Sequence, residues 1–235
     1  MRERWWAGLW LLCFLAAAAS GQQQCVWYGV CHTDDNAYHT KQNCLNNTQP
    51  LPLRNVSMDL KLRKLCPNFY QSEDHPKLCC NHEQVDVFDQ NMATPRSALA
   101  RCPSCFRNFV ELWCQSTCAP IQRDFLRVEA TVPVNASSPQ GPKYITEIDY
   151  FLSDDYKYGM YNACKNVQFP SANKRAIGLL CGGDASTCTA DSWLHYLGSR
   201  SGNELVPFQI NFKTGNDSTV KVNGTGCPTP ATTRM

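Results

Sequence analysis

The sequence has few of the features that mark nucleic-acid-binding proteins, metalloenzymes or membrane-spanning chains. Its 235 residues include 22 Lys and Arg against 20 Asp and Glu, and it contains no basic stripe, acidic tail or low-complexity tract. We therefore expect no nucleic-acid partner. Only five histidines occur, and none lies in a nucleophile, metalloprotease or zinc-ligand motif. We accordingly predict no catalytic residue, no metal and no cofactor, and the protein is not expected to be an enzyme.

Residues 1–21 are typical of a secretory signal peptide. Arg2 and Arg4 supply a short basic start, and residues 5–19 are almost wholly apolar and end in small residues, after which we expect cleavage. A signal anchor is the competing interpretation, but this apolar run is short for a bilayer span and polar residues 22–24 follow it at once. No later segment reaches membrane-spanning length. We therefore expect membrane attachment only through a C-terminal region beyond this sequence.

Cysteine is abundant, in contrast to histidine. Fifteen occur, of which Cys13 lies in the leader, so an even fourteen remain. An even number behind a secretory signal predicts a framework of disulfides in an oxidising compartment. Spacing alone leaves the pairing open. The fourteen are Cys25, Cys31, Cys44, Cys66, Cys79, Cys80, Cys102, Cys105, Cys114, Cys118, Cys164, Cys181, Cys188 and Cys227.

Two other uses of cysteine fit part of this pattern. Cys102 and Cys105 form a CxxC of the kind found in thioredoxin-like redox proteins, and with Cys114 and Cys118 they also resemble a set of zinc ligands. A redox site of that type follows a parallel strand, whereas the segment before Cys102 has a helical pattern. Oxidation in the secretory pathway competes with zinc binding. The disulfide interpretation is therefore preferred to both.

Five N-glycosylation sequons support the same compartment. One alone arises often by chance, but five behind a signal peptide, mostly beside proline, glycine or polar residues, indicate surface loops. The acceptors are Asn46, Asn55, Asn135, Asn216 and Asn223.

Hydrophobic periodicity predicts a single α+β domain. Apolar residues at three- and four-residue steps predict helices, and Pro103 begins a new helix within the strongest helical stretch. Alternating apolar residues predict strands, two of which form a hairpin. The aromatic-rich segment between Cys25 and Cys31 is expected to be a tethered loop. The expected helices are 59–66, 83–92, 97–118, 154–166, 173–180 and 190–197, and the expected strands are 125–134, 143–152 and 206–212.

Short motifs around the cysteines carry a family resemblance. In chain order they are CVWYGVC from Cys25, LCC from Leu78, RCPSCF from Arg101, MYNAC from Met160 and GLLCG from Gly178, followed by a PF pair. With these motifs in this order, the chain resembles the N-terminal luminal domain of the Niemann–Pick C1 family of sterol transporters. The resemblance covers nearly everything after the leader.

The resemblance implies a disulfide-rich domain whose helices and small mixed or antiparallel sheet surround an apolar pocket for cholesterol or a related sterol. Asn43 and Gln84 would hold the sterol hydroxyl, because side-chain amides supply both a donor and an acceptor without net charge. Burial of the apolar rings would supply most of the affinity. The pocket wall would consist of Trp27, Phe88, Asn91, Phe106, Trp113, Pro207, Phe208 and Ile210.

The same resemblance implies domain bounds, a partner and a compartment. The sterol-binding domain would cover residues 22–227, and residues 228–235 would form a short polar tail that ends before the linker and membrane spans of the family. Sterol would pass between this domain and a soluble carrier of the Niemann–Pick C2 type. The compartment would be the lumen of late endosomes or lysosomes, or the outside of the cell for this shorter chain. The entrance would include Leu179, Leu180, Asp184 and Trp193.

The disulfide pairing also follows from the resemblance. The implied pairs are Cys25–Cys79, Cys31–Cys44, Cys66–Cys114, Cys80–Cys118, Cys105–Cys164 and Cys181–Cys188. Cys102 and Cys227 are left over, since their usual partners lie farther downstream in the family, and we hypothesise that they pair with each other. Three positions depart from the family pattern: Val30 replaces an acidic residue, Phe88 a leucine and Trp113 a phenylalanine.

Two rival functions remain open beside sterol binding. A folate- or riboflavin-carrier-like protein also uses disulfide-caged α+β domains. Such vitamins need several convergent polar groups, whereas this sequence offers one amide pair and mostly apolar walls. A secreted disulfide-rich hydrolase is the enzymatic rival, and its turnover would be abolished by a single His, Ser or Asp substitution. Binding of a sterol is the preferred hypothesis.

Overall fold

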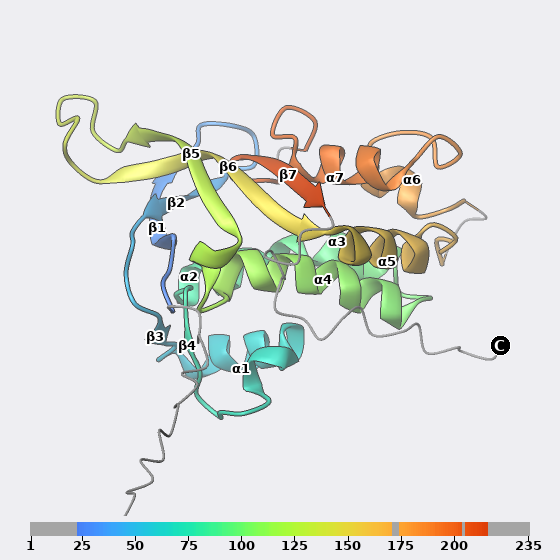
Figure 1. Ribbon diagram of the computed structural model, residues 1–235, viewed down its shortest axis with the longest axis horizontal. Coiled ribbons are helices and arrows are strands. Elements are labelled where there is room, and N and C mark those ends of the chain that lie inside the picture. The colour runs from blue at the N-terminus through green and yellow to red at the C-terminus, as the bar shows by residue number, and fades with distance from the viewer. Residues whose placement is uncertain (1–22, 171–173, 204, 216–235) are drawn as a thin grey trace, which may run out of the picture.

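The structure, a computed structural model, describes residues 23–170, 174–203 and 205–215. It confirms a disulfide-rich α+β fold (Figure 1). The strands are β1 (Trp27–Thr33), β2 (Lys41–Leu45), β3 (Leu51–Pro52), β4 (Lys77–Leu78), β5 (Leu126–Pro133), β6 (Lys143–Ser153) and β7 (Gln209–Gly215). The α-helices are α1 (Val56–Leu65), α2 (His82–Asn91), α3 (Ala93–Ala98), α4 (Pro103–Cys118), α5 (Asp154–Cys164), α6 (Ile177–Leu180) and α7 (Ala190–Gly198), with 3₁₀ turns at η1 (Pro67–Tyr70) and η2 (Gln122–Asp124).

The main sheet is mixed and is organised around the long strand β6. Its order is β1-β2-β6-β5, with β7 also paired to β6. The path from β1 to β5 is antiparallel, whereas β7 runs parallel to β6. β2 pairs with the start of β6 at Tyr144 and β7 with its later part from Glu147, so both strands lie along the same edge of β6. The β5–β6 hairpin extends beyond the rest of the molecule (Figure 1).

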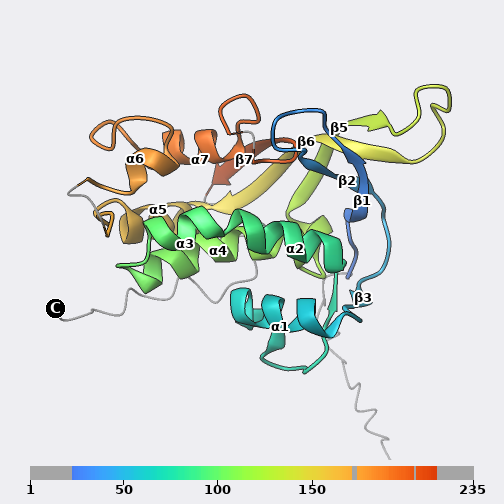
Figure 2. The same cartoon turned by 180° about the vertical axis from the view of Figure 1, so that it is seen from behind.

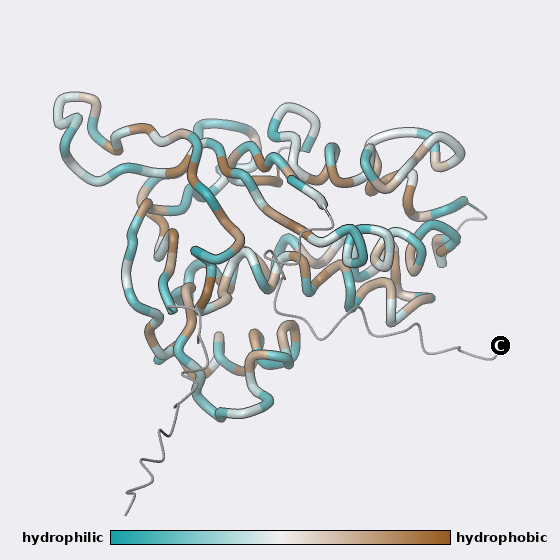
Figure 3. Tube along the Cα trace, in the orientation of Figure 1, coloured by the Kyte–Doolittle hydropathy of each residue, from teal (hydrophilic) through white to brown (hydrophobic). Residues whose placement is uncertain are grey.

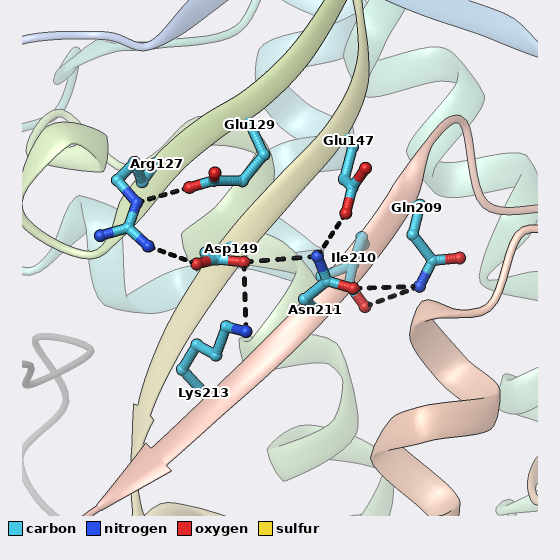
Figure 4. Close-up of polar contacts among 8 residues, drawn as sticks. All are labelled: Arg127, Glu129, Glu147, Asp149, Gln209, Ile210, Asn211 and Lys213. Atoms are coloured by element: carbon cyan, nitrogen blue, oxygen red, sulfur yellow. Dashed lines mark hydrogen bonds and ion pairs between the residues drawn. The ribbon is translucent and has the colours of Figure 1, made fainter.

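The two faces of this sheet differ in chemistry. Ile148 and Tyr150 of β6 are buried on the inner face, because successive side chains of a strand point to opposite sides. Between them Asp149 lies on the outer face, where Arg127 and Lys213 surround its carboxylate (Figure 4). The inner face therefore packs on the core, and the outer face carries a network of charges.

A layer of helices packs beneath the sheet. In both views α2, α3 and α4 run below the strands, and α1 lies on the far side of α2 (Figures 1 and 2). Two buried tyrosines tie neighbouring elements to α4: the hydroxyl of Tyr150 donates to the carbonyl of Leu112 at 2.9 Å, and that of Tyr156 to the carbonyl of Asn108 at 2.7 Å. Hydrophobic and hydrophilic residues alternate along the elements rather than separating into an apolar end (Figure 3).

Local sequence explains where the helices start. Asn81 and Thr189 each begin a helix with a capping box, in which the cap side chain and the third residue of the helix satisfy each other's backbone N–H groups. Pro103 opens α4 at the position where a missing N–H costs nothing. α7 ends at Gly198, where an added Cβ would overlap the carbonyl of Ile210. The glycine thus lets α7 close tightly on β7.

Six disulfides cross-link these elements, and they are the six pairs that the family resemblance implies. Among the described residues Cys102 has no disulfide partner, and Cys227 lies outside them, so their proposed bond stays a hypothesis. The six pairs are Cys25–Cys79, Cys31–Cys44, Cys66–Cys114, Cys80–Cys118, Cys105–Cys164 and Cys181–Cys188.

Several expected elements differ from the structure. The loop predicted between Cys25 and Cys31 is wrong, since β1 begins at Trp27 and each cysteine pairs elsewhere. The helix predicted over 173–180 includes residues outside the described ranges, and within them α6 begins only at Ile177. β7 begins at Gln209, later than predicted. β2, β3 and β4 were not predicted, because they are short and lack a clear apolar alternation.

Candidate functional site

A cavity of about 230 Å³ lies among α2, α3, α4, α6 and α7 and strands β1, β2 and β7. Small-molecule sites typically have volumes of about 300–1,000 Å³, so this cavity is slightly below their range. Elements from both halves of the chain build it, and the disulfides and tyrosine hydrogen bonds described above hold those elements in place.

Two helices supply the longest parts of the cavity wall. On α2 the lining residues Gln84, Phe88 and Asn91 follow at steps of four and three, so they share one helix face. On α4 Phe109 and Trp113 share a face in the same way. A helix rises about 1.5 Å per residue, so the α2 face extends for about 10 Å from Gln84 to Asn91. The cavity therefore extends along α2, and the residues around the start of this helix differ from those around its last turn.

The end at the start of α2 carries a pair of side-chain amides. Gln84 is only 4% exposed, and its Nε2 donates to Oδ1 of Asn43 at 3.4 Å. Oε1 of Gln84 accepts from the backbone N–H of Gly29 at 2.8 Å and from that of Asn81 at 3.0 Å. These two donors fix the orientation of the Gln84 amide, because a nitrogen in that place would face two N–H groups. The nitrogen of Gln84 must then face Asn43, and Asn43 must present its oxygen.

Backbone geometry brings the two amides together. The β1–β2 pairing is irregular between Trp27 and Val30, and within this bulge Gly29 has φ +82°, which favours glycine. Val30 then pairs with Asn43 across the two strands. The bulge thus delivers one N–H to Gln84, and β2 delivers Asn43 to the same place.

One charged side chain lies at this amide end. Among the described residues that line the cavity, Lys41 alone carries a formal charge. It precedes Asn43 by two residues on β2, so both face the same side of the sheet. Its Nζ donates to Oγ1 of Thr33 at 3.2 Å and lies 3.7 Å from a carboxylate oxygen of Glu83. The side chains of Lys41 and Glu83 are 40% and 41% exposed, so this charged pair is in contact with solvent.

The opposite end of the cavity forms an apolar mouth. Leu179 and Leu205 line the cavity and are also 49% and 41% exposed. Nδ2 of Asn91 donates to the carbonyl of Leu205 at 3.5 Å, which joins the end of α2 to the segment before β7. An apolar ligand can therefore reach the cavity from this side without crossing charged groups of the described lining.

Several residues that the resemblance assigns to the wall do line the cavity. Phe88 and Asn91 come from α2, Trp113 from α4, and Pro207 and Ile210 from β7 and the segment before it. The two assigned to the hydroxyl, Asn43 and Gln84, lie together at one end. Of the entrance residues, Leu179 and Leu180 line the opposite end.

Three other wall residues are placed differently. Trp27, Phe106 and Phe208 are absent from the described lining. Trp27 and Phe208 are buried and pack against each other with ring centroids 5.3 Å apart, so they support the wall from behind. Phe106 is partly buried, and the guanidinium carbon of Arg96 lies 5.9 Å from its ring centroid. Aromatic character indicated burial correctly but did not distinguish the core from the cavity surface.

The remaining entrance residues also lie outside the described lining. Trp193 is fully buried and its ring stacks on Phe109 with centroids 6.2 Å apart. Asp184 is exposed and its carboxylate accepts the backbone N–H of Ser186 at 2.7 Å, which lowers the pKa of Asp184. Trp193 therefore holds a wall residue in place, while Asp184 belongs to the outer surface of the loop after α6.

Sequence reasoning missed much of the lining. Residues on α2 and α4 could have been found by extending their helical periodicity, whereas those on β2 had no such indication, because that strand was not predicted. The missed residues are Thr40, Lys41, Val87, Met92, Thr94, Pro95, Phe109, Ser116, Thr117, Tyr196, Leu197, Asn203, Leu205 and Val206.

Within the described residues no group of three or more His, Cys, Asp or Glu side chains is arranged to hold a metal ion. The helices in the same part of the chain are all too short or too polar to cross a membrane.

Comparison with known proteins identifies the family of this chain. A family model described as the Niemann-Pick C1 N terminus matches residues 22–233. The chain belongs to this family. The assignment confirms the resemblance carried by the cysteine motifs, and those motifs lie at the disulfides that frame the cavity.

Related proteins extend well beyond the region that this family member covers. The NPC intracellular cholesterol transporter 1 of Sus scrofa is 37% identical over 203 residues, which are 85% of this chain and 15% of that protein. The homolog 1b of Drosophila melanogaster is 31% identical over 90% of this chain and 17% of its own length. The NPC1-like intracellular cholesterol transporter 1 of Rattus norvegicus is 30% identical over 88% and 16%. The chain thus spans 15–17% of these relatives.

Proposed function

We propose that this chain binds cholesterol or a closely related sterol in the cavity, as one step of intracellular sterol transport. The hydroxyl end lies at Asn43 and Gln84, and the ring system and tail extend along α2 toward the apolar mouth. The amide pair at one end of an elongated apolar cavity carries this proposal, supported by the relatives named as cholesterol transporters. The role is binding rather than catalysis.

The chemistry of the two ends matches that of a sterol. A hydroxyl accepts from an amide N–H and donates to an amide oxygen, and Asn43 and Gln84 offer both kinds of atom. Burial of apolar ligand surface contributes about 25 cal/mol per Å², so the rings supply most of the affinity and the amides supply orientation. Folate and riboflavin carry several polar groups along their length, and the side chains of Val87, Phe88 and Ile210 offer those groups no partner.

Sterol leaves and enters through the mouth at Leu179 and Leu205, by contact with a soluble carrier of the Niemann–Pick C2 type. Exposed apolar side chains at a cavity rim are suited to such transient contact. Leu179→Asp is expected to slow transfer of bound cholesterol to that carrier while equilibrium binding is retained. Leu60→Asp is the matched control, since Leu60 on α1 is 53% exposed and is not among the described cavity residues. Equal transfer rates in the two variants would place the exit elsewhere.

The domain, residues 22–227, works in the lumen of late endosomes or lysosomes. Asn46, Asn55 and Asn135 are exposed, and Asn216 and Asn223 lie outside the described residues. Oδ1 of Asn55 caps α1 by accepting from Met58, which leaves its Nδ2 available for a glycan. A mass shift on treatment with an N-glycosidase tests passage through the secretory pathway, and no shift would contradict it.

Equilibrium binding of radiolabelled cholesterol to the purified, fully oxidised chain tests the proposal. We expect saturable one-to-one binding that Val87→Trp abolishes, because the larger side chain fills the cavity at a lining position. Val132→Trp is the matched control, on the β5–β6 hairpin at 39% exposure, and should bind normally. Normal binding of cholesterol by Val87→Trp would show that the binding site lies elsewhere in the protein. Folded protein that takes folate or riboflavin but no cholesterol would favour the vitamin-carrier alternative.

A further inference from the structure

We infer that the amide end of the cavity also accepts a sterol whose 3-oxygen carries a sulfate, with Lys41 as the residue that recognises the anion. The inference rests on the proposed function, since it places the sterol body in the same cavity. It concerns the polar end alone, where hydrogen-bond donors outnumber acceptors.

The side-chain amides of Asn43 and Gln84 have more N–H groups available to a ligand than oxygen lone pairs. Both lone-pair directions of Gln84 Oε1 are taken by the N–H groups of Gly29 and Asn81. Asn43 Oδ1 already accepts from Gln84 Nε2. No described residue accepts from Nδ2 of Asn43, and Nε2 of Gln84 keeps a second hydrogen. With this arrangement intact, the amide pair presents mainly N–H groups to a ligand.

Such an arrangement suits a group that accepts several hydrogen bonds and donates none. A sterol hydroxyl must donate its own hydrogen, and the amides leave it a single acceptor, the second lone pair of Asn43 Oδ1. A sulfate ester has no hydrogen to donate and several oxygens that accept. Its negative charge strengthens each bond, because hydrogen bonds to an ionised partner are about twice as strong as neutral ones.

Lys41 adds a cation at this same end. It shares the side of β2 with Asn43, and within the described lining no carboxylate opposes it. Its Nζ lies 3.7 Å from Glu83 and donates one hydrogen to Thr33, so a further hydrogen remains for a ligand. Because Lys41 is 40% exposed, a sulfate beside it keeps part of its hydration and avoids the cost of burying an unpaired charge.

Competition against radiolabelled cholesterol, with the purified full chain, tests this inference. The competitors are cholesterol, cholesterol 3-sulfate and cholesterol methyl ether, which blocks the same oxygen without adding charge. We expect the sulfate to compete at least as well as cholesterol and better than the ether. Lys41→Gln should weaken sulfate binding, relative to its effect on cholesterol binding, by about two- to fivefold, the range for a partly exposed ion pair.

Two further variants sharpen the assignment. Glu83→Gln removes the carboxylate that competes for Lys41, so it should strengthen sulfate binding, whereas Lys41→Gln weakens it. Lys41→Arg keeps the positive charge and should bind sulfate as well as the unmodified chain does. Lys61→Gln is the matched control, since Lys61 is 37% exposed, also pairs with carboxylates and is not among the described cavity residues. Sulfate that fails to compete while cholesterol binds would overturn this inference alone. If cholesterol sulfate competes equally well in Lys41→Gln and Lys61→Gln, the assignment of Lys41 to the sulfate is also overturned. Failure of cholesterol itself to bind would overturn the proposed function with it.

Discussion

The protein has two clusters of polar side chains on its main sheet, and they differ in how completely their hydrogen bonds are used. On the outer face the carboxylate of Asp149 is 5% exposed and receives Arg127 at 2.5 Å, Asn211 at 3.3 Å and Lys213 at 3.6 Å (Figure 4). At the cavity end the amides of Asn43 and Gln84 share one bond of 3.4 Å and keep donors without a partner in the described structure.

The difference separates a structural cluster from the proposed binding site. A buried polar group is normally satisfied within the protein, and an unsatisfied one costs about 1–3 kcal/mol. The carboxylate of Asp149 has its partners in the fold and needs no ligand. The amide end retains unused N–H groups beside an apolar cavity, where we propose that a ligand oxygen accepts from them.

The largest effect is expected from Gln84→Ala. Gln84 has both a structural role and a proposed binding role. Its oxygen accepts from the backbone N–H groups of Gly29 and Asn81, and its nitrogen faces the cavity. Removing it leaves the buried N–H of Gly29 and the partly buried N–H of Asn81 without an acceptor, so the free energy of unfolding should fall by about 2 kcal/mol. Cholesterol binding should be lost as well. Urea unfolding monitored by tryptophan fluorescence, combined with equilibrium binding, measures both.

Asn43→Ala is the matched comparison, since the Asn43 side chain makes no hydrogen bond to a backbone group in the described structure. The free energy of unfolding should change by less than about 0.5 kcal/mol, as at a site without a structural role. Affinity for cholesterol should fall about tenfold, which corresponds to about 1.4 kcal/mol of binding free energy. A variant that unfolds as easily as Gln84→Ala yet binds normally would contradict this division of roles.

A smaller effect is expected on the outer face from Asp149→Asn. The substitution removes the charge that Arg127 and Lys213 share, but these side chains are 61% and 51% exposed and regain water. The free energy of unfolding should therefore fall by only about 1 kcal/mol. Cholesterol affinity should stay within about twofold of the unmodified chain. Loss of binding in a folded Asp149→Asn protein would show that the two clusters are coupled through the sheet.

Much of the fold could be predicted from the sequence, because long periodic segments and caps are local features. The α4 stripe around Phe109 and Trp113 and the β5–β6 hairpin are of this kind. The short strand β2 is not, since its five residues form a strand through pairing with β1 and β6. Missing β2 also meant missing Lys41, which has no distinguishing sequence pattern.

The candidate site was predictable only in part for a similar reason. Hydrophobicity predicts that a residue is buried, but it does not say whether the residue faces the core or a cavity. Trp27 and Trp193 are consequently behind the wall, whereas Val87 and Leu205 line it. The amide pair came from the family resemblance. Its donor-rich character depends on the bulge at Gly29, which no local pattern indicates.

The smallest effect concerns a third polar group, the partly buried carboxylate of Glu111. Its hydrogen bonds are satisfied more fully than those of the amide pair and less fully than those of Asp149. Glu111 on α4 accepts from Asn68 at 3.0 Å and from Gln115 at 2.6 Å, so it has amide partners but no cation. Burial raises the pKa of Glu111, and the two hydrogen bonds oppose that rise only in part. The folded protein therefore binds a proton here more readily than the unfolded chain does.

The sign of the pH dependence follows from this raised pKa. The stability linked to protonated Glu111 is complete below the ordinary glutamate pKa of about 4.3 and is lost as pH rises through the raised value in the folded state. Glu111→Gln removes this titration, so its melting temperature relative to the unmodified chain should increase from pH 4 to pH 7. Glu73→Gln, at an exposed carboxylate, should show no such trend. Parallel pH profiles for the two variants would mean that Glu111 is as well solvated as a surface carboxylate, and that an amide pair can satisfy a buried charge as fully as the cations around Asp149 do.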